Sequence, residues 1–317
     1  MNWHHKAATQ RVLSRLPFGG DINFLLSRYV TGHVPASEQT LRRDVEFAKL
    51  HLAACRDCGE VPVEEACFYE FGAGWDLIIA LSFYMMGVNR QLLLDLHPLL
   101  RPKLVALTAA ALESNRLGID SARGLAELRC PGSYSELCSN LKQRFGITYS
   151  APADASETGL RAQSIDCVTS TKVLCHIPLC ELPAILSESH RLLRDRGIAS
   201  FVIDYRDQYS YSDPNISPYN FLQFSEQQWS RFNPPLHYQN RLRHSDYRRL
   251  FEASGFEILR EVRAQPSAAE SAAIPSLQLN ASFHNYEAED LYAVRGEFVL
   301  RRGCTAAVAA ARAACSG

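Results

Sequence analysis

The sequence predicts an open, mostly parallel α/β sheet, because strand-like and helix-like segments alternate from about residue 66 onward. Residues 66–69 form an apolar and aromatic run, and the turn Glu70-Phe71-Gly72-Ala73-Gly74 is too rich in glycine to continue it. Residues 75–86 then have helical length and an apolar stripe, and residues 91–96 form a second apolar run. This strand–helix–strand unit predicts two neighbouring parallel strands with helices on both faces of the sheet.

The glycine turn and Asp95 are predicted to lie side by side. Ligands of open parallel sheets bind at the carboxyl ends of the strands, which is where both features fall. Gly72 and Gly74 let the backbone approach a ligand closely, and the carboxylate of Asp95 can accept hydrogen bonds from a ribose diol. These residues predict a nucleoside site.

A pyrophosphate is disfavoured at this site. The dinucleotide fingerprint has a third glycine where this chain has Leu77, and Asp76 would repel a phosphate. Glu70 likewise favours a cationic ligand. The order strand, acidic residue, x-Gly-x-Gly, helix, strand, acidic residue resembles motif I of the class I S-adenosylmethionine-dependent methyltransferases. The resemblance implies a Rossmann-like seven-stranded sheet and S-adenosyl-L-methionine as cofactor, with an NAD(P)-dependent oxidoreductase as the alternative.

Composition narrows the classes of partner. The chain has 317 residues, 47% of them hydrophobic, which suffices for one large α/β domain with additions. Its 33 basic and 34 acidic residues leave a net charge of -1, with no excess to bind nucleic acid or an anionic membrane. Without a signal peptide or a long apolar run, a cytoplasmic protein is expected. The oligomeric state stays open, with a homodimer as one option.

The ten cysteines do not predict a metal site. Cys55-Arg56-Asp57-Cys58 is the one CxxC pair, and no second pair follows at the spacing of a zinc site. A redox motif of the thioredoxin kind would follow a strand and open a helix, whereas this pair precedes the first strand. Most other cysteines lie in apolar segments, where a buried thiol is the simple interpretation.

Residues 1–60 are predicted to form a helical cap. Apolar stripes at residues 12–16 and 22–30 are separated by Pro17-Phe18-Gly19-Gly20, and Ser37 is suited to cap a helix that runs to about Cys55. The cap either forms a lid over the site or covers the sheet or a partner subunit.

After Asp95, helices are predicted over residues 99–117 and 133–145, and a third strand over residues 147–149. The resemblance implies that a polar residue just after this strand meets the adenine amino group. Asp154 stands there, with a turn-forming aspartate as the alternative.

Residues 164–170 form a fourth apolar strand that resembles motif IV of the same family. The following Thr171-Lys172-Val173-Leu174-Cys175-His176 corresponds to the Val-Leu-x-His continuation, so the resemblance places Thr171 in the cofactor site and His176 near the methyl group. A helix over residues 182–193, a basic turn at residues 194–197 and a fifth strand over residues 198–203 complete the matching segment.

An aromatic lid is predicted over about residues 205–245, because this tract has no clear periodicity yet is too aromatic for disorder. It is assigned to the acceptor pocket, with a packing lid as the alternative. The candidate substrate-binding residues are Tyr205, Tyr209, Tyr211, Asn220, Trp229, Tyr238 and Arg241.

The rest of the chain closes the sheet. Ser245 is expected to cap a helix over residues 246–253, and strands are expected over residues 256–262 and 291–300, the last as a hairpin partner. The methyltransferase domain thus covers residues 61–302. The alanine-rich residues 303–317 are expected to be disordered.

The chemistry expected is in-line methyl transfer, for which the protein aligns the acceptor and excludes water. An oxygen acceptor also loses a proton, which a neutral imidazole can take. His176 is the first candidate base and His237 the second, while Asp204 and Asp207 are candidates to orient the base or the acceptor. No spacing supports a metal. The predicted function is O-methylation of a small-molecule or sugar-like acceptor; a noncatalytic nucleoside-binding protein is a further alternative.

Overall fold

The computed structural model describes residues 2–18, 20–22, 24, 34–114, 116–130, 132–272 and 274–303. Most of the apolar stripe predicted at residues 22–30, and the tail from residue 304 onward, lie outside the described residues. No helix in the described part of the chain has the length and apolar character needed to cross a membrane.

Seven strands form one sheet in the order β3-β2-β1-β4-β5-β7-β6, in which β7 is antiparallel to both of its neighbours. The strands are β1 (Cys67–Phe71), β2 (Arg90–Leu94), β3 (Ile147–Ser150), β4 (Ile165–Thr171), β5 (Leu193–Asp204), β6 (Phe256–Ala264) and β7 (Arg295–Arg302). The predicted α/β fold is confirmed. Because β1, β2, β3, β4 and β5 are parallel, their carboxyl ends meet at one edge.

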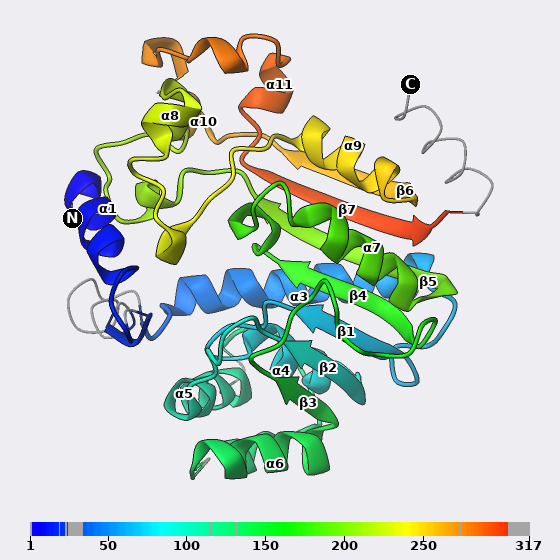
Figure 1. Cartoon of the computed structure of the whole chain (residues 1–317). Coiled ribbons are helices and arrows are strands. Elements are labelled where there is room, and N and C mark those ends of the chain that lie inside the picture. Colours follow the sequence, from blue (N-terminus) through cyan, green and yellow to red (C-terminus); the bar gives the residue numbers. More distant parts are fainter. Residues whose placement is uncertain are drawn as a thin grey trace.

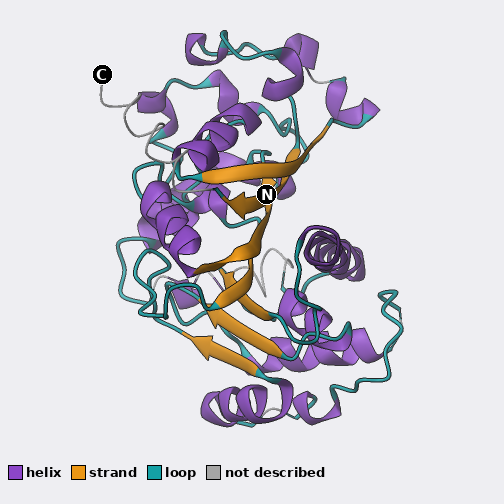
Figure 2. Cartoon of the chain, turned by 90° about the vertical axis from the view of Figure 1, so that its right-hand side faces the viewer, coloured by secondary structure: helices purple, strands orange, loops and turns teal. Residues whose placement is uncertain are grey.

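Helices cover both faces of the sheet (Figures 1 and 2). On one face the core contains side chains of α3 (Glu38–Cys58), α4 (Ile78–Met85), α5 (Pro102–Glu113) and α6 (Tyr134–Phe145). On the other face it contains side chains of α7 (Leu182–Leu192) and α9 (His244–Ala253). Neighbouring strand residues divide between the two faces, as Phe68 and Tyr69 do, because successive side chains of a strand point in opposite directions.

The two N-terminal helices α1 and α3 pack against different parts of the molecule. Helix α3 packs on the sheet through apolar residues such as Val45 and Leu52. Helix α1 (Trp3–Leu13) instead lies beside the irregular segment after β5 (Figure 1). Trp3 packs edge-on against Phe232 with ring centroids 4.8 Å apart, and its amide donates to Asp213 over 2.9 Å. Helix α1 and the segment after β5 therefore form one unit.

The segment after β5 is irregular but packed. It contains the short helix α8 (Glu226–Trp229) and several 3₁₀ turns, and the later stretch 265–294 adds α10 (Ala268–Ser271) and α11 (Ala288–Leu291). Aromatic residues of both stretches join α1 in a third apolar cluster. These contacts explain how a tract without periodicity can be ordered, since its side chains are buried on each other.

Three predicted boundaries were wrong. Residues 194–197 belong to β5, where they form an irregularity: Ile165 pairs with Leu193 and Cys167 with Ile198, so only Asp166 faces the four residues. Helix α9 begins at His244 rather than after a Ser245 cap, because Asp246 accepts a hydrogen bond from the amide of Arg243 over 2.7 Å. Strand β7 begins at Arg295 rather than Leu291, because Leu291 ends α11 and packs in the third cluster.

Candidate active site at the carboxyl ends of the strands

Two residues of the turn after β1, Gly72 and Gly74, have a left-handed backbone conformation that favours glycine. Gly72 has φ +80°, and a Cβ there would overlap the side chain of Val173. Gly74 has φ +77°, and a Cβ there would meet nothing within 4 Å. Gly72 is therefore required by packing, whereas Gly74 borders open space that a ligand can enter.

Asp95 joins the glycine turn to the ends of β2 and β3. Its Oδ2 accepts a hydrogen bond from the amide of Gly74 over 3.2 Å and another from the hydroxyl of Tyr149 over 2.8 Å. Burial raises the pKa of Asp95 to about 6, although these hydrogen bonds act in the opposite direction. Tyr149, which the sequence did not indicate as a site residue, therefore helps to hold the carboxylate in place.

Glu70 is a buried acid without a partner. Its side chain is 3% exposed, and its Oε2 has no hydrogen-bond partner in the described part of the chain. Burial, reinforced by the charge of Asp95, raises the pKa of Glu70 to about 8. A buried, unpaired carboxyl next to a second acid favours a cationic ligand, because a positive group nearby would stabilise both carboxylates.

Thr171, at the end of β4, is held by a histidine that no sequence motif marked. His51 of α3 places its Nε2 3.0 Å from the Thr171 hydroxyl and its Nδ1 2.8 Å from the Ser200 hydroxyl. Burial lowers the pKa of His51 to about 3, so the ring is neutral. Lys172, which follows Thr171 in the chain, has φ +60° and makes an ion pair with Asp44 of α3 over 2.6 Å. Helix α3 thus fixes the carboxyl end of β4.

Asp154 has the geometry of a turn-forming aspartate. It is exposed, and its Oδ1 accepts hydrogen bonds from the amide and the hydroxyl of Ser156, both over 2.7 Å. These hydrogen bonds lower the pKa of Asp154. The loop nevertheless adjoins the site, because the amide of Ala153 donates to the carbonyl of Asp95 over 3.0 Å.

A cavity of about 1070 Å³, called here the large cavity, connects the glycine turn with the segment after β5. Seven predicted site residues line it: Gly74, Thr171, His176, Asp204, Tyr211, His237 and Tyr238. Residues of the N-terminal helices, such as Arg43, also line it, as do Trp75 and His97. The structure therefore brings cofactor, catalytic and substrate candidates to one space.

His176 is fixed through one ring nitrogen. Its Nδ1 lies 2.8 Å from the carbonyl oxygen of Tyr238, so Nδ1 carries the hydrogen and donates it. Burial acts to lower the pKa of His176, but Cys175, the Tyr238 carbonyl and Asp204 outweigh it and raise the pKa to about 9. His176 lines the large cavity, so its imidazole can contact a ligand there.

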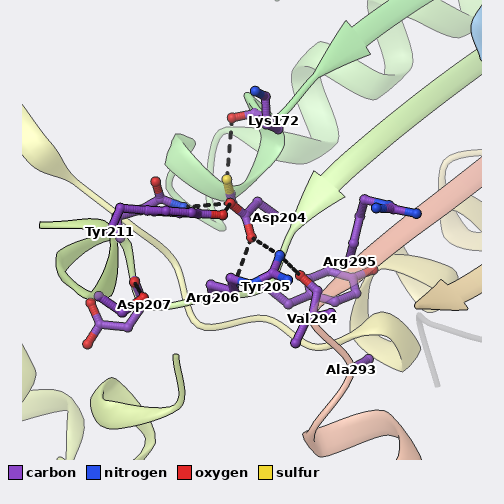
Figure 3. Close-up of polar contacts among 12 residues, drawn as sticks. Lys172, Asp204, Tyr205, Arg206, Asp207, Tyr211, Ala293, Val294 and Arg295 are labelled. Carbon is purple, nitrogen blue, oxygen red and sulfur yellow. Dashed lines mark hydrogen bonds and ion pairs between the residues drawn. The ribbon is translucent and has the colours of Figure 1, made fainter. Parts of the chain in front are cut away.

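Asp204 is the centre of a polar network at the end of β5 (Figure 3). Its Oδ2 accepts hydrogen bonds from the hydroxyl of Tyr211 over 2.6 Å and from Gln208 over 3.2 Å, and its Oδ1 accepts one from the amide of Arg206 over 3.1 Å. Arg206 also pairs with Glu270 over 3.0 Å. The carboxylate is therefore positioned from three sides and has no freedom to move far into the cavity.

His237 is a neutral imidazole with an unused nitrogen. Burial, together with the positive charges of Lys6 and His176, lowers its pKa to about 3. Its Nε2 is buried and has no hydrogen-bond partner among the described residues. Because such atoms are rare in native proteins, the nitrogen is suited to a hydrogen bond with a ligand.

Other predicted residues do not line the large cavity; they hold the segment after β5 together. Asp207 is fully buried and accepts hydrogen bonds from Asn220 over 3.0 Å and from the amide of Tyr209 over 2.8 Å. The hydroxyl of Tyr209 donates to the carbonyl of Phe232 over 2.6 Å. Burial raises the pKa of Asp207 to about 6. Asp207, Asn220 and Tyr209 thus have structural contacts in place of ligand-facing ones.

Tyr205, Trp229 and Arg241 also have internal partners. The hydroxyl of Tyr205 lies 3.0 Å from Nδ1 of His244, in the core beneath α9. Trp229 is buried in the third cluster, and Arg241 donates to the carbonyl of Phe221 over 3.0 Å while pairing with Glu226. Aromatic and amide residues in an irregular tract resemble ligand-binding residues in sequence, yet here they satisfy each other.

Comparison with known proteins gives a family match within the sheet. Residues 131–201 match the family model described as a methyltransferase domain, a segment that runs from the turn before α6 into β5. A search of curated proteins finds no match.

Solved structures that align with this chain have low sequence identity to it. An S-adenosylmethionine-dependent methyltransferase from Mesorhizobium loti is 17% identical, with 81% of this chain and 98% of that chain covered and a TM-score of 0.42. The YcgJ protein from Bacillus subtilis is 12% identical, with 82% and 98% covered and a TM-score of 0.43. The [4+2]-cyclase SpnF is 13% identical, with 82% and 80% covered and a TM-score of 0.44. These structures are too distant from this chain to indicate which reaction it catalyses.

The residues present fit S-adenosyl-L-methionine. Gly74 borders open space, Asp95 presents a carboxylate after β2, and Oε2 of the buried Glu70 has no partner among the residues that the structure describes. This chemistry suits a nucleoside that carries positive charge and a ribose diol. The strand order agrees with this cofactor site, and the family model covers β3, β4 and part of β5. The match of residues 131–201 to a methyltransferase domain and the order of the strands therefore agree with a site for S-adenosyl-L-methionine at this edge of the sheet.

Proposed function

We propose that the protein methylates an oxygen atom of a small-molecule acceptor and that His176 takes the proton. The observation that carries this proposal is the large cavity, which extends from Gly74 and Thr171 to His176 and Asp204. Its volume of about 1070 Å³ suits a cofactor together with a small acceptor, since ligand pockets typically hold about 300–1,000 Å³.

The cofactor supplies an electrophilic methyl group, so the chain mainly has to bind and align. Asp95 would accept hydrogen bonds from the ribose hydroxyls, and the backbone at Gly74 would lie against the nucleoside. Glu70 would stabilise the amino group. In this proposal Asp154 contacts the adenine side of the site through its loop rather than through a preformed free carboxylate, since Ser156 already occupies its Oδ1.

His176 is suited to accept a proton through Nε2, because Nδ1 donates to the carbonyl of Tyr238. With a pKa of about 9 the ring is mostly protonated at neutral pH. Positive charge beside it in the cavity favours the neutral form and therefore lowers this pKa toward the working range. Tyr211, held by Asp204, would bind the acceptor on the same side.

The residues at the start of α4 argue against the alternative function, an NAD(P)-dependent oxidoreductase. The carboxylate of Asp76 accepts a hydrogen bond from the amide of Ile78 over 3.3 Å, so an acid occupies the position where a pyrophosphate would bind. We retain the division into a helical cap (residues 1–60), a methyltransferase domain (61–302) and an acceptor lid (205–245). Helix α1 belongs functionally with the lid, because the two pack together.

The test has two stages. Calorimetry with S-adenosylhomocysteine should show binding, and His176→Ala should retain that affinity while lowering turnover about a hundredfold or more on a panel of hydroxyl acceptors. His284→Ala, at an exposed histidine, is the matched control and should keep full turnover. Absence of S-adenosylhomocysteine binding would refute the cofactor, and full turnover of His176→Ala would refute the base.

A further inference from the structure

A second cavity of about 460 Å³ lies against α1, and we call it the α1 cavity. Lys6 and Gln10 line it from the helix, and Trp75, Tyr211 and His237 line it from elsewhere. Trp75, Tyr211 and His237 also line the large cavity, so the two spaces are neighbours. Lys6 and Gln10 are four residues apart and therefore lie on one face of α1.

Lys6 brings a positive charge to this space without a carboxylate bound to it. Among the described residues no acidic oxygen forms an ion pair with its Nζ, which donates to the hydroxyl of Ser212 over 3.0 Å. The acid whose charge acts on Lys6 is Asp207, whose oxygens accept hydrogen bonds from Asn220 and the amide of Tyr209. Burial lowers the pKa of Lys6, and the charge of Asp207 opposes that shift. The cation is thus only partly compensated.

Two further polar atoms at the α1 cavity lack partners. Gln10 is 4% exposed, and its Oε1 is buried without a hydrogen bond among the described residues, as is Nε2 of His237. Buried polar atoms in native proteins are nearly always hydrogen-bonded, and leaving one unpaired costs about 1–3 kcal/mol. Both residues line the same cavity, so both side chains lie beside a ligand bound there.

The one acid in the lining is directed elsewhere. Asp76 accepts a hydrogen bond from the amide of Ile78 over 3.3 Å, and burial raises its pKa. One carboxylate oxygen is thus held at the first amide of α4, and Lys6 is the positively charged side chain in the lining.

We propose that the α1 cavity binds the acceptor and selects a carboxylic acid, with the acceptor carboxylate on Lys6, hydrogen-bond donors of the acceptor on Gln10 and His237, and its apolar body between Trp75 and Tyr211. A single lysine matches a carboxylate, which carries one negative charge. This inference rests on the proposed methylation, because it names the class of acceptor and places the acceptor carboxylate in the cavity that adjoins the large cavity. It makes α1 part of the acceptor site and gives Gln10 and His237 the partners they lack.

The test compares carboxylic acids with their neutral amides. The probes are 3-hydroxybenzoate, 4-hydroxyphenylacetate and 3-phenyllactate, each with its amide, titrated by calorimetry with and without saturating S-adenosylhomocysteine. At least one acid should bind the wild-type protein about tenfold or more tightly than its amide, as expected for a charge-assisted hydrogen bond. If no acid binds better than its amide, the proposal is overturned.

Variants show whether Lys6 is the cause. Lys6→Met should weaken the acid about tenfold or more and leave the amide within about twofold, whereas Lys6→Arg should retain most of the affinity. Gln10→Glu should also weaken the acid only, because its charge would neutralise Lys6 one turn away. Lys142→Met, at an exposed lysine of α6, is the control. Wild-type affinity of Lys6→Met for the acid would overturn the proposal.

S-adenosylhomocysteine separates this inference from the proposed function. Lys6→Met should bind S-adenosylhomocysteine like the wild-type protein, and its melting temperature should show that α1 remains folded. Failure of the wild-type protein to bind S-adenosylhomocysteine would remove the proposed function, whereas loss of acid preference alone would remove only the role of the α1 cavity.

Discussion

The amide of Gly74 donates a hydrogen bond to Oδ2 of Asp95 over 3.2 Å, and this contact ties the turn after β1 to the end of β2. The two positions are separated by twenty-one residues, yet parallel pairing of β1 with β2 brings them together. Since Asp95 also accepts from Tyr149 of β3, three neighbouring strand ends share one carboxylate. The candidate cofactor site is thus partly organised by contacts within the chain itself.

Asp95 is predicted to contribute strongly to cofactor affinity. Asp95→Ala should weaken S-adenosylhomocysteine binding by about 1.5–3 kcal/mol, because charge-assisted hydrogen bonds to the ribose are lost. Tyr149→Phe keeps the carboxylate and removes one of its donors, so its effect should be about 0.5–1.5 kcal/mol. Calorimetry measures both, and unchanged affinity of Asp95→Ala would show that the ribose lies elsewhere.

The two glycines should respond differently to alanine. Gly72→Ala should destabilise the fold by about 2 kcal/mol or more, because its positive φ is strained and its methyl group would overlap Val173. Gly74→Ala should cost only about 1–2 kcal/mol of stability but weaken S-adenosylhomocysteine, since its methyl group enters open space. Thermal unfolding and calorimetry separate the two effects. Equal cofactor affinity of Gly74→Ala and the wild-type protein would contradict the proposed position of the nucleoside.

Glu70 is predicted to release a proton when the cofactor binds. Its pKa of about 8 leaves it mostly protonated at pH 7, and a cationic amino group nearby favours the ionised form. S-adenosylhomocysteine should therefore release protons at pH 7 and bind more tightly as the pH rises toward 8. Calorimetry in buffers of different ionisation enthalpy measures the release. Glu70→Gln should abolish the Glu70 contribution, and an unchanged proton release in that variant would refute the assignment.

The same residue gives stability a dependence on pH. The pKa of Glu70 is about 8 in the folded protein against an ordinary value of 4.5, so the folded state binds more protons between these values. The free energy of unfolding should therefore fall as the pH rises from 4.5 to 8. Denaturant unfolding of Glu70→Gln across this range should show a shallower fall than the wild-type protein. If the free energy of unfolding of both proteins fell equally with pH, burial would not raise the pKa of Glu70.

Tyr211 and Tyr205 form a matched pair for a test of the acceptor site. Tyr211→Phe removes a hydroxyl that faces the large cavity and donates to Asp204, so turnover should fall about tenfold or more. Tyr205→Phe removes a buried hydroxyl beside His244, so stability should fall by about 1 kcal/mol with turnover retained. If Tyr205→Phe lost turnover and Tyr211→Phe lost only stability, the assignment of Tyr211 to the acceptor site would be wrong.

The sheet could be predicted from the sequence because its signals are local. The apolar runs at β1 and β4 and the cap at Ser37 before α3 depend on neighbouring residues, and the structure confirms them. Gly72 and Asp95 were likewise marked by their positions at strand ends. One boundary failed where a distant partner decided it, because Asp166 pairs with Arg194 beside the irregular part of β5.

The acceptor half could be predicted only in outline. Tyr209 and Trp229 were indistinguishable in sequence from Tyr211 and Tyr238, because burial of an aromatic residue depends on which other segments pack on it. Lys6, Gln10 and His51 gave no signal, since they enter the site from helices that precede the glycine turn.

The antiparallel placement of β7 brings Asp204 opposite Arg295, so the stretches that follow β5 and precede β7 leave the sheet at adjacent points. They pack on each other, as Tyr219 does by donating to the carbonyl of Tyr292, whereas Gly74 and Asp95 belong to the other half of the sheet. The candidate acceptor stretches and the candidate cofactor residues therefore leave the sheet from different halves, so that a substitution in one set need not disturb the other.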